Sequence, residues 1–148
     1  MPEQETLERA EEDKREGKAP STQAGEFVRE EIEHVREGKH GARSAKQAIA
    51  IGLSKARRAG VKLSPPKKGK ASKETRKQAA RDVRKGKSAG KGKKSAKRSR
   101  ATLGALKREG HSAASKTALS RQARSAAAKR SAASRSRAAK KAARTRKK

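Results

Sequence analysis

Apolar residues spaced three and four positions apart predict two consecutive helices in the first half of the chain. Ser21 or Thr22 can cap a first helix that runs to about Glu37, and Gly38 can end it. Its apolar face carries Ala24, Phe27, Val28, Ile32 and Val35.

A second helix is predicted from a cap at Ser44 to about Ala59. Gly60 can end it, and Pro65-Pro66 block its continuation. Its apolar face carries Ala45, Ala48, Ile49, Gly52, Leu53 and Ala56. With the turn over residues 38–43, the two helices form a small hairpin over residues 21–66, similar in outline to a helix-turn-helix. A unit of this size can require a partner, a second copy or nucleic acid to be stable.

The flanking segments have weaker patterns. Residues 2–17 indicate a polar helix that we expect to be frayed, because Leu7 is its one large apolar residue. Another helix is expected over residues 72–85, with Ser72 as its cap. Residues 84–100 are rich in Lys, Gly and Ser and should be flexible. Residues 110–148 should form helix transiently, because Ala, Lys and Arg favour helix while the charges repel.

Composition leads to the predicted fold class. Large aliphatic residues and Phe number 15 and Ala 29, while the formal net charge is +29. High charge with low hydrophobicity is typical of disorder. We therefore predict a mostly disordered, partly α-helical chain without β-sheet. Its segments are an acidic polar segment (1–20), the helical hairpin (21–66) and a basic low-complexity tail rich in Lys, Arg, Ala and Ser (67–148).

Charge is divided unevenly along the chain. Residues 1–37 have a net charge of −6, residues 38–148 have +35, and no acid follows Glu109. Such a basic segment is expected to bind polyanions, most of all duplex DNA, by neutralising phosphates and releasing counterions. The acidic head could then compete with DNA for the tail and act as an intramolecular brake. A tail that serves solubility alone is the less favoured interpretation.

The expected activity is DNA compaction or bridging with little sequence preference, as in histone-like, nucleoid-associated proteins. One alternative is binding of structured RNA or ribosome association. Another is a protein-interaction module, or self-association through the hairpin, with the tail localising the chain to the nucleoid. The candidate phosphate-binding residues are Arg43, Lys46, Lys55, Arg57, Arg58, Lys67, Lys68, Lys70, Lys91, Lys93, Lys94, Lys97, Arg98, Arg100, Arg121, Arg124, Lys129, Arg130, Arg135, Arg137, Lys140, Lys141, Arg144, Arg146, Lys147 and Lys148.

The basic side of the second helix has two interpretations of equal weight: a surface for a phosphate backbone or groove, and an ordinary solvent-facing side. Base-specific readout is not expected, because Gln47 is the one residue on that side with a base-reading amide. Phe27 is the sole aromatic residue apart from histidine and belongs to the predicted core, which argues against base stacking on single-stranded RNA.

Enzymatic activity and cofactors are not expected. The chain has no Cys, and it shows no phosphate loop, nucleophile elbow or convincing carboxylate pair. His34, His40 and His111 are scattered, with Glu30 and His34 as the one aligned pair, so we expect surface histidines and no metal. The acidic N-terminus is no signal peptide, and the longest apolar run is too short to span a bilayer. A soluble, cytoplasmic protein that does not bind membranes is expected.

Two resemblances add to this interpretation. The run Ser21-Thr22-Gln23-Ala24-Gly25-Glu26-Phe27-Val28, followed by residues 38–54 and 56–60, resembles a family of small basic bacterial proteins of unknown function, over residues 21–69. That resemblance implies a bacterial setting and supplies no activity or site residues. By composition, the C-terminal half resembles the tails of linker histones and bacterial histone-like proteins. Residues 64–68 resemble Ser-Pro-basic elements of linker-histone tails, although an extended linker is the favoured interpretation.

Overall fold

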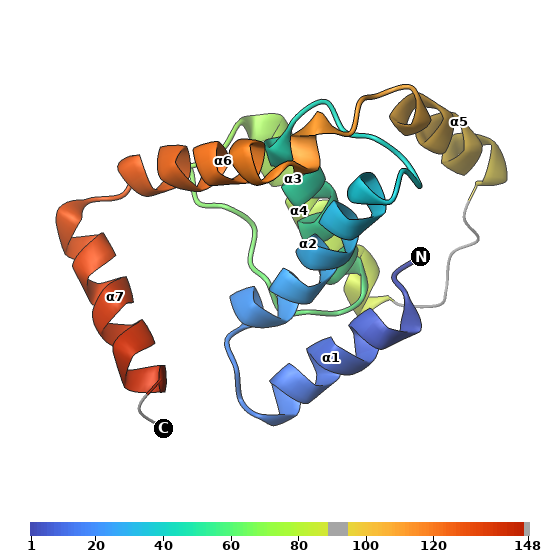
Figure 1. Ribbon diagram of the computed structural model, residues 1–148. Helices are drawn as coiled ribbons and strands as arrows, with labels where there is room; N and C mark the ends of the chain where they lie inside the picture. The colour runs from blue at the N-terminus through green and yellow to red at the C-terminus, as the bar shows by residue number, and fades with distance from the viewer. Residues whose placement is uncertain (89–94, 147–148) are drawn as a thin grey trace.

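The computed structural model describes residues 1–88 and 95–146 and is built from α-helices (Figure 1). They are α1 (Gln4–Arg15), α2 (Pro20–Arg36), α3 (Ala45–Arg58), α4 (Lys73–Lys87), α5 (Ala96–Lys107), α6 (Lys116–Ala128) and α7 (Ala132–Arg146), with a short 3-10 helix η1 (Ser112–Ala114). Within these residues there is no strand, and one isolated bridge joins Lys68 to Ala71. The prediction of a mostly disordered chain is therefore wrong.

The two helices predicted in the first half are confirmed, with a correction at the first start. Helix α2 begins at Pro20, and no side chain caps it, whereas Ser21 or Thr22 was expected as the cap. Proline suits the first turn of a helix because its fixed φ is already helical and it has no N–H to leave unpaired. Helix α3 does start after Ser44, whose Oγ accepts a hydrogen bond from the Gln47 amide at 3.2 Å.

Helices α2 and α3 pack closely along their predicted apolar faces. Gly38, with φ of +74°, ends α2 in a conformation that glycine adopts without strain. At Gly52 a Cβ atom would lie 2.6 Å from the Cα of Val28, so a glycine lets the two backbones approach. The chain thus relies on small residues where larger side chains would hold the helices apart.

Alanine explains why composition gave the wrong fold class. Among the residues that the structure describes, eleven apolar residues are buried, and nine of them are Ala, the others being Phe27 and Val35. Each alanine buries little area, but it favours helix and lets neighbouring helices pack closely. Counting large apolar residues therefore underestimated the packing that this chain achieves.

Helix α1 is not a frayed, isolated segment. It packs against α2, where Leu7 and Ala10 join a cluster with Ala24, Phe27 and Ala56. The backbone N–H of Glu3 also donates to the Glu30 carboxylate at 3.0 Å. The acidic N-terminal segment is part of the packed body.

Helix α4 packs against α3, across the boundary predicted at residue 66. Its predicted cap is confirmed, because Ser72 Oγ accepts from the Thr75 amide at 3.1 Å. A Cβ atom at Gly86 would lie 2.1 Å from the carbonyl oxygen of Arg57. The flexibility expected over 84–100 is wrong for residues 84–87 and 96–100, which are helical, while 89–94 lie outside the described residues.

The segment before α6 lies against the turn between α2 and α3. The backbone N–H groups of Gly41 and Ala42 donate to the carbonyl oxygens of Leu106 and Gly110 at 2.9 and 3.0 Å. In the same region Ala113 and Ala114 of η1 are buried in a cluster with Val35, Ala42 and Ala48. The basic C-terminal region is thus attached to the body at η1.

Three C-terminal helices are held to different degrees. Helix α6 packs on η1 and α3, whereas α5 and α7 belong to none of the main helix packings of the described residues. Figure 1 shows α7 at an angle to α6 and apart from the body. The transient helix expected over 110–148 is instead formed as η1, α6 and α7, with residues 147–148 outside the described part. No described helix is long and apolar enough to cross a membrane.

Candidate nucleic-acid interface

Lys55, expected to contact phosphate, holds α3 to α2. Its Nζ lies 3.0 Å from Glu30 Oε1 and 2.7 Å from Glu31 Oε2, and both glutamates are buried. Burial of Lys55 opposes its charged form, but the two carboxylates prevail and raise its pKa above the usual value. The same ammonium group and the Glu3 amide hold Glu30 ionised, so the pKa of Glu30 is lowered despite its own burial. A phosphate would have to displace these carboxylates to reach Lys55.

Arg57 and Arg58 also form hydrogen bonds within the fold. Arg57 is 8% exposed and its Nε donates to the carbonyl oxygen of Leu63 at 3.2 Å. Burial lowers the pKa of Arg57 below its usual value. Arg58 Nε donates to Asp82 Oδ1 of α4 at 2.7 Å, and this carboxylate is buried. Both arginines thus tie α3 to neighbouring segments, although the Arg58 side chain stays 49% exposed.

The side-chain carbonyl oxygen of Gln47 is used within the turn before α3. Gln47 Oε1 accepts a hydrogen bond from the backbone N–H of Arg43 at 2.7 Å, and the backbone N–H of Gln47 donates to Ser44 Oγ at 3.2 Å. This reciprocal pair resembles a capping box. On the predicted basic side of α3, Lys46 stays exposed, and Arg43 in the preceding turn is exposed with Glu109 at 3.7 Å.

Some acids of the N-terminal segment (residues 1–20) are paired with cations of the same segment. Asp13 is buried and accepts from Lys18 Nζ at 2.8 Å. Exposed acids remain on α1 at Glu8, Glu11 and Glu12. In Figure 1 helix α1 lies below α2 and α6 lies above it. Helices α1 and α6 therefore lie on different sides of α2.

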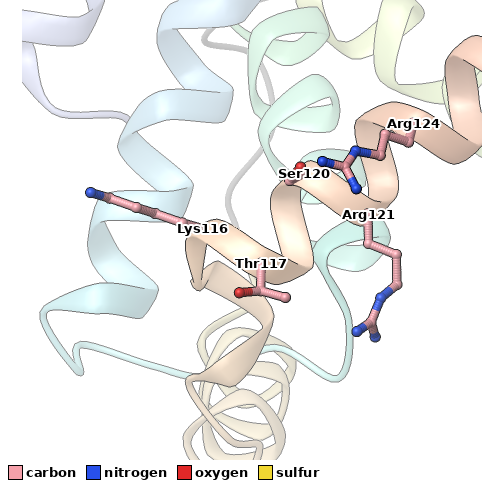
Figure 2. Close-up of a pocket in the computed structure, with 5 residues that line it drawn as sticks. All are labelled: Lys116, Thr117, Ser120, Arg121 and Arg124. Atoms are coloured by element: carbon pink, nitrogen blue, oxygen red, sulfur yellow. The ribbon is translucent and has the colours of Figure 1, made fainter.

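Helix α6 presents a basic hollow at the surface (Figure 2). Ser115 caps the helix by accepting from the Ala118 amide at 3.1 Å. A pocket of about 460 Å³ is lined along one stretch of the helix by Lys116, Thr117, Ser120, Arg121 and Arg124. Figure 2 shows Lys116 pointing away from the two arginines, so the charged groups are spread over the surface. All five side chains can donate hydrogen bonds, and none is acidic.

A second hollow adjoins the first and extends the basic surface toward α2. It has a volume of about 440 Å³, and its lining includes Arg36, His111 and the shared Lys116. Arg36 Nε donates to the carbonyl oxygen of Ala114 at 2.9 Å, which ties this cation to η1. Together the two hollows run from the end of α2 along α6.

Helix α7 continues the basic surface beyond the body. The described residues after Glu109 contain no acid, so no carboxylate there competes for the cations. Its exposed cations are Arg135, Arg137, Lys140, Lys141, Arg144 and Arg146. This helix therefore presents several solvent-exposed positive charges.

The remaining candidate residues are distributed over the surface. The exposed ones are Lys67, Lys68 and Lys70 before α4, Lys97, Arg98 and Arg100 on α5, and Lys129 and Arg130 between α6 and α7. Lys91, Lys93, Lys94, Lys147 and Lys148 lie outside the described residues. The structure brings Arg121 and Arg124 to one pocket and does not gather the others there.

Sequence reasoning missed three pocket residues: Lys116, Thr117 and Ser120. A signal was present, because Ser115 is a good helix cap and would place Lys116 in the first helical position. Helical periodicity then brings residues 117, 120, 121 and 124 to one side. Exposed cations on α4 were also omitted, namely Lys73, Lys77, Arg81, Arg84, Lys85 and Lys87.

Comparison with known proteins adds one finding. Residues 14–68 match the model of a family of unknown function (DUF6496). The matched segment contains α2 and α3 and ends before α4, α6 and α7. It confirms the expected resemblance of this part of the chain to an uncharacterised family. No curated protein and no solved structure is significantly similar to the chain.

Proposed function

We propose that this protein binds duplex nucleic acid, with DNA as the favoured partner, by neutralising phosphates with α6 and α7. The observation that carries the proposal is the pocket on α6, whose lining consists of Lys116, Arg121, Arg124 and two hydroxyl side chains, with no acid. Lys, Arg, Ser and Thr side chains are the usual donors to phosphate oxygens. Such contacts position a duplex and carry no base sequence, so little sequence preference is expected.

The burial of the chain's one aromatic residue other than histidine supports a duplex over single strands. The chain has one Phe and neither Tyr nor Trp. That residue, Phe27, is 1% exposed and is packed with Ala10, Ala24 and Ala56. Single-strand binders generally stack bases on aromatic side chains.

Helix α6 is anchored while α7 extends from it, so the two helices offer cations at different positions. This arrangement suits compaction or bridging of DNA, as in histone-like, nucleoid-associated proteins.

The test is a salt titration of binding to a mixed-sequence DNA duplex, with full-length protein and the variant Arg121→Gln/Arg124→Gln. Each lost phosphate contact lowers the slope of log K against log salt by about 0.9, so the double variant should lower it by about 2. The matched control is Lys14→Gln/Arg15→Gln, which removes the same charge from exposed positions on α1. The control should leave the slope unchanged.

Two results would count against the proposal. Equal losses in the two variants would mean that net charge, and not the α6 surface, sets the affinity. Weak binding of the unaltered protein at physiological salt would remove nucleic acid as the partner and favour the protein-interaction module. An RNA hairpin titrated in parallel tests the choice of partner, because tighter binding to it would favour structured RNA over DNA.

A further inference from the structure

Three potential metal ligands meet beside the turn that follows α2. Glu31 and His34 lie three positions apart on α2, and His40 follows in the turn. One ligand atom from each side chain lies within 4.8 Å of the other two. The two imidazole rings have centroids 6.0 Å apart and stand edge to face at 86°. The expectation of three scattered surface histidines is wrong for His40, which is buried.

His40 is held in the orientation that a metal ligand requires. Its Nδ1 lies 3.0 Å from the carbonyl oxygen of Gly41, which can only accept, so Nδ1 carries a proton. Its Nε2 lies 3.0 Å from Glu31 Oε1. A neutral imidazole would then point a lone pair at a carboxylate. A positive charge between the two atoms removes that conflict, and a metal-bound histidine commonly donates its other N–H to a carbonyl.

His34 repeats the arrangement with a second carboxylate. Its Nε2 lies 2.9 Å from Oε1 of Glu3, the residue that precedes α1. Two imidazoles therefore face two carboxylates in a small volume. Glu3 adds a fourth side chain, and a second carboxylate, from a different part of the chain.

The carboxylates around the cluster outnumber the lysine ammonium groups that pair with them. Glu3, Glu30 and Glu31 are paired with Lys39 and Lys55, whose Nζ atoms lie 3.0 Å from Glu3 Oε1 and 2.7 Å from Glu31 Oε2. Lys39 also pairs with the exposed Glu37 at 3.1 Å, so carboxylates outnumber ammonium groups here when both imidazoles are neutral. A bound cation or a proton on one imidazole would supply the missing positive charge, and these two states are separable by experiment.

We propose that Glu31, His34 and His40 bind a divalent transition-metal ion, with Zn²⁺ the best match and Glu3 available as a fourth ligand. Two imidazoles and a carboxylate form a ligand set that zinc accepts, whereas Mg²⁺ and Ca²⁺ prefer oxygen alone. The bound ion would fix the start of α1 and the turn after α2 to one point. None of the proposed ligands lines either hollow of the basic surface, so the proposal does not depend on the proposed nucleic-acid binding.

Histidine NMR on the full, chelator-treated protein tests the site directly, because the chain has three histidines and the exposed His111 serves as internal reference. Addition of ZnCl₂ should shift the ring-nitrogen signals of His34 and His40, saturate at one equivalent and leave His111 unchanged. Absence of a response at His34 and His40 would overturn the proposal in favour of an imidazolium–carboxylate network. An equal response of all three histidines would mean adventitious surface binding and would also overturn it.

Two matched variants supply a second readout. His34→Gln should weaken zinc binding at least tenfold, as expected for loss of a ligand, while His111→Gln should bind as the unaltered protein does. Zinc should raise the Tm of the unaltered protein and of His111→Gln more than that of His34→Gln. Equal zinc affinities in the two variants would contradict the assignment, even if His34→Gln is less stable without metal.

Discussion

The backbone N–H of Gly41 donates a hydrogen bond to the carbonyl oxygen of Leu106 at 2.9 Å, joining the turn after α2 to the segment that leads into α6. Ala42 repeats the contact with Gly110 at 3.0 Å, and Ala114 of η1 is fully buried nearby. The basic region therefore leaves the body at a fixed point. Cations on α6 are presented from a packed helix, unlike those of a freely moving tail.

Gly41→Ala should break this attachment. A Cβ atom at residue 41 would lie 1.9 Å from the carbonyl oxygen of Glu109, which is backbone and cannot rotate away. Overpacking of this kind destabilises by about 1–3 kcal/mol. Urea denaturation should show the loss, and amide hydrogen exchange should accelerate at positions 41 and 42.

Gly25→Ala is the matched control for that substitution. Gly25 lies within α2, and a Cβ atom there meets nothing within 4 Å. Alanine is favoured over glycine in a helix by about 0.5–1 kcal/mol, so the control should stabilise the protein. Equal stability of the two variants would show that residues 106–110 do not press on the turn.

Asp82→Ala should weaken the packing of α4 on α3. Asp82 is 1% exposed and accepts from Ser54 Oγ and Arg58 Nε, each at 2.7 Å, and from Gln78 Nε2 at 3.0 Å. Removing the buried carboxylate takes away the acceptor of half-buried Ser54 and of exposed Arg58 and Gln78, which can turn to water, so we expect a loss of about 1–2 kcal/mol in unfolding free energy. Urea denaturation of Asp82→Ala, Arg58→Ala and the double variant measures the coupling.

Additive effects of the Arg58 and Asp82 substitutions would contradict a direct interaction. Glu74→Ala provides a control on the same helix, because Glu74 is an exposed acid in the first turn of α4. It should lose no more than the helix-dipole contribution, about 0.3–1 kcal/mol. DNA affinity should respond little to Arg58→Ala if this arginine serves packing.

The sequence was sufficient for the elements with clear periodicity. Apolar spacing located α2 and α3, and Ser44 and Ser72 were recognised as caps because a short side-chain oxygen before a helix pairs with its free N–H groups. Helix α1 was judged too polar to pack. Its burial depends on long-range contacts, such as those of Ala10 with the α2–α3 cluster, that no local pattern encodes.

The candidate site was harder to predict because exposure depends on tertiary partners. Lys55 and Arg58 look like ordinary surface cations in the sequence, and they are paired with acids 24 or 25 residues away. Likewise, Glu31 and His40 meet because the turn after α2 folds back, which helical spacing alone does not show. In contrast, no acid follows Glu109, so the composition of this segment already indicated that its cations lack a local carboxylate partner.

The brake attributed to the acidic head stays a hypothesis, and the structure sharpens its test. Deleting residues 1–20 would remove packed residues such as Leu7 and Ala10, so a change in DNA affinity would be ambiguous. Glu8→Gln/Glu11→Gln/Glu12→Gln removes exposed charges and leaves the packing intact. Because α1 packs on α2 and charges beyond about 8 Å are screened at physiological salt, we expect less than about a twofold change in duplex affinity there. A large gain would support the brake.

Removal of residues 132–148 should separate binding from stability. Helix α7 belongs to none of the main helix packings of the described residues, so the truncated protein should keep the Tm of the full chain. The deleted segment contains eight Lys and Arg residues and no acid. If all eight contact phosphate, the slope of log K against log salt should become shallower by about 7, and by less if some do not. Thermal denaturation and a duplex salt titration on the same samples measure both quantities. An unchanged slope with unchanged Tm would exclude α7 from the interface and leave the α6 surface as the binding site.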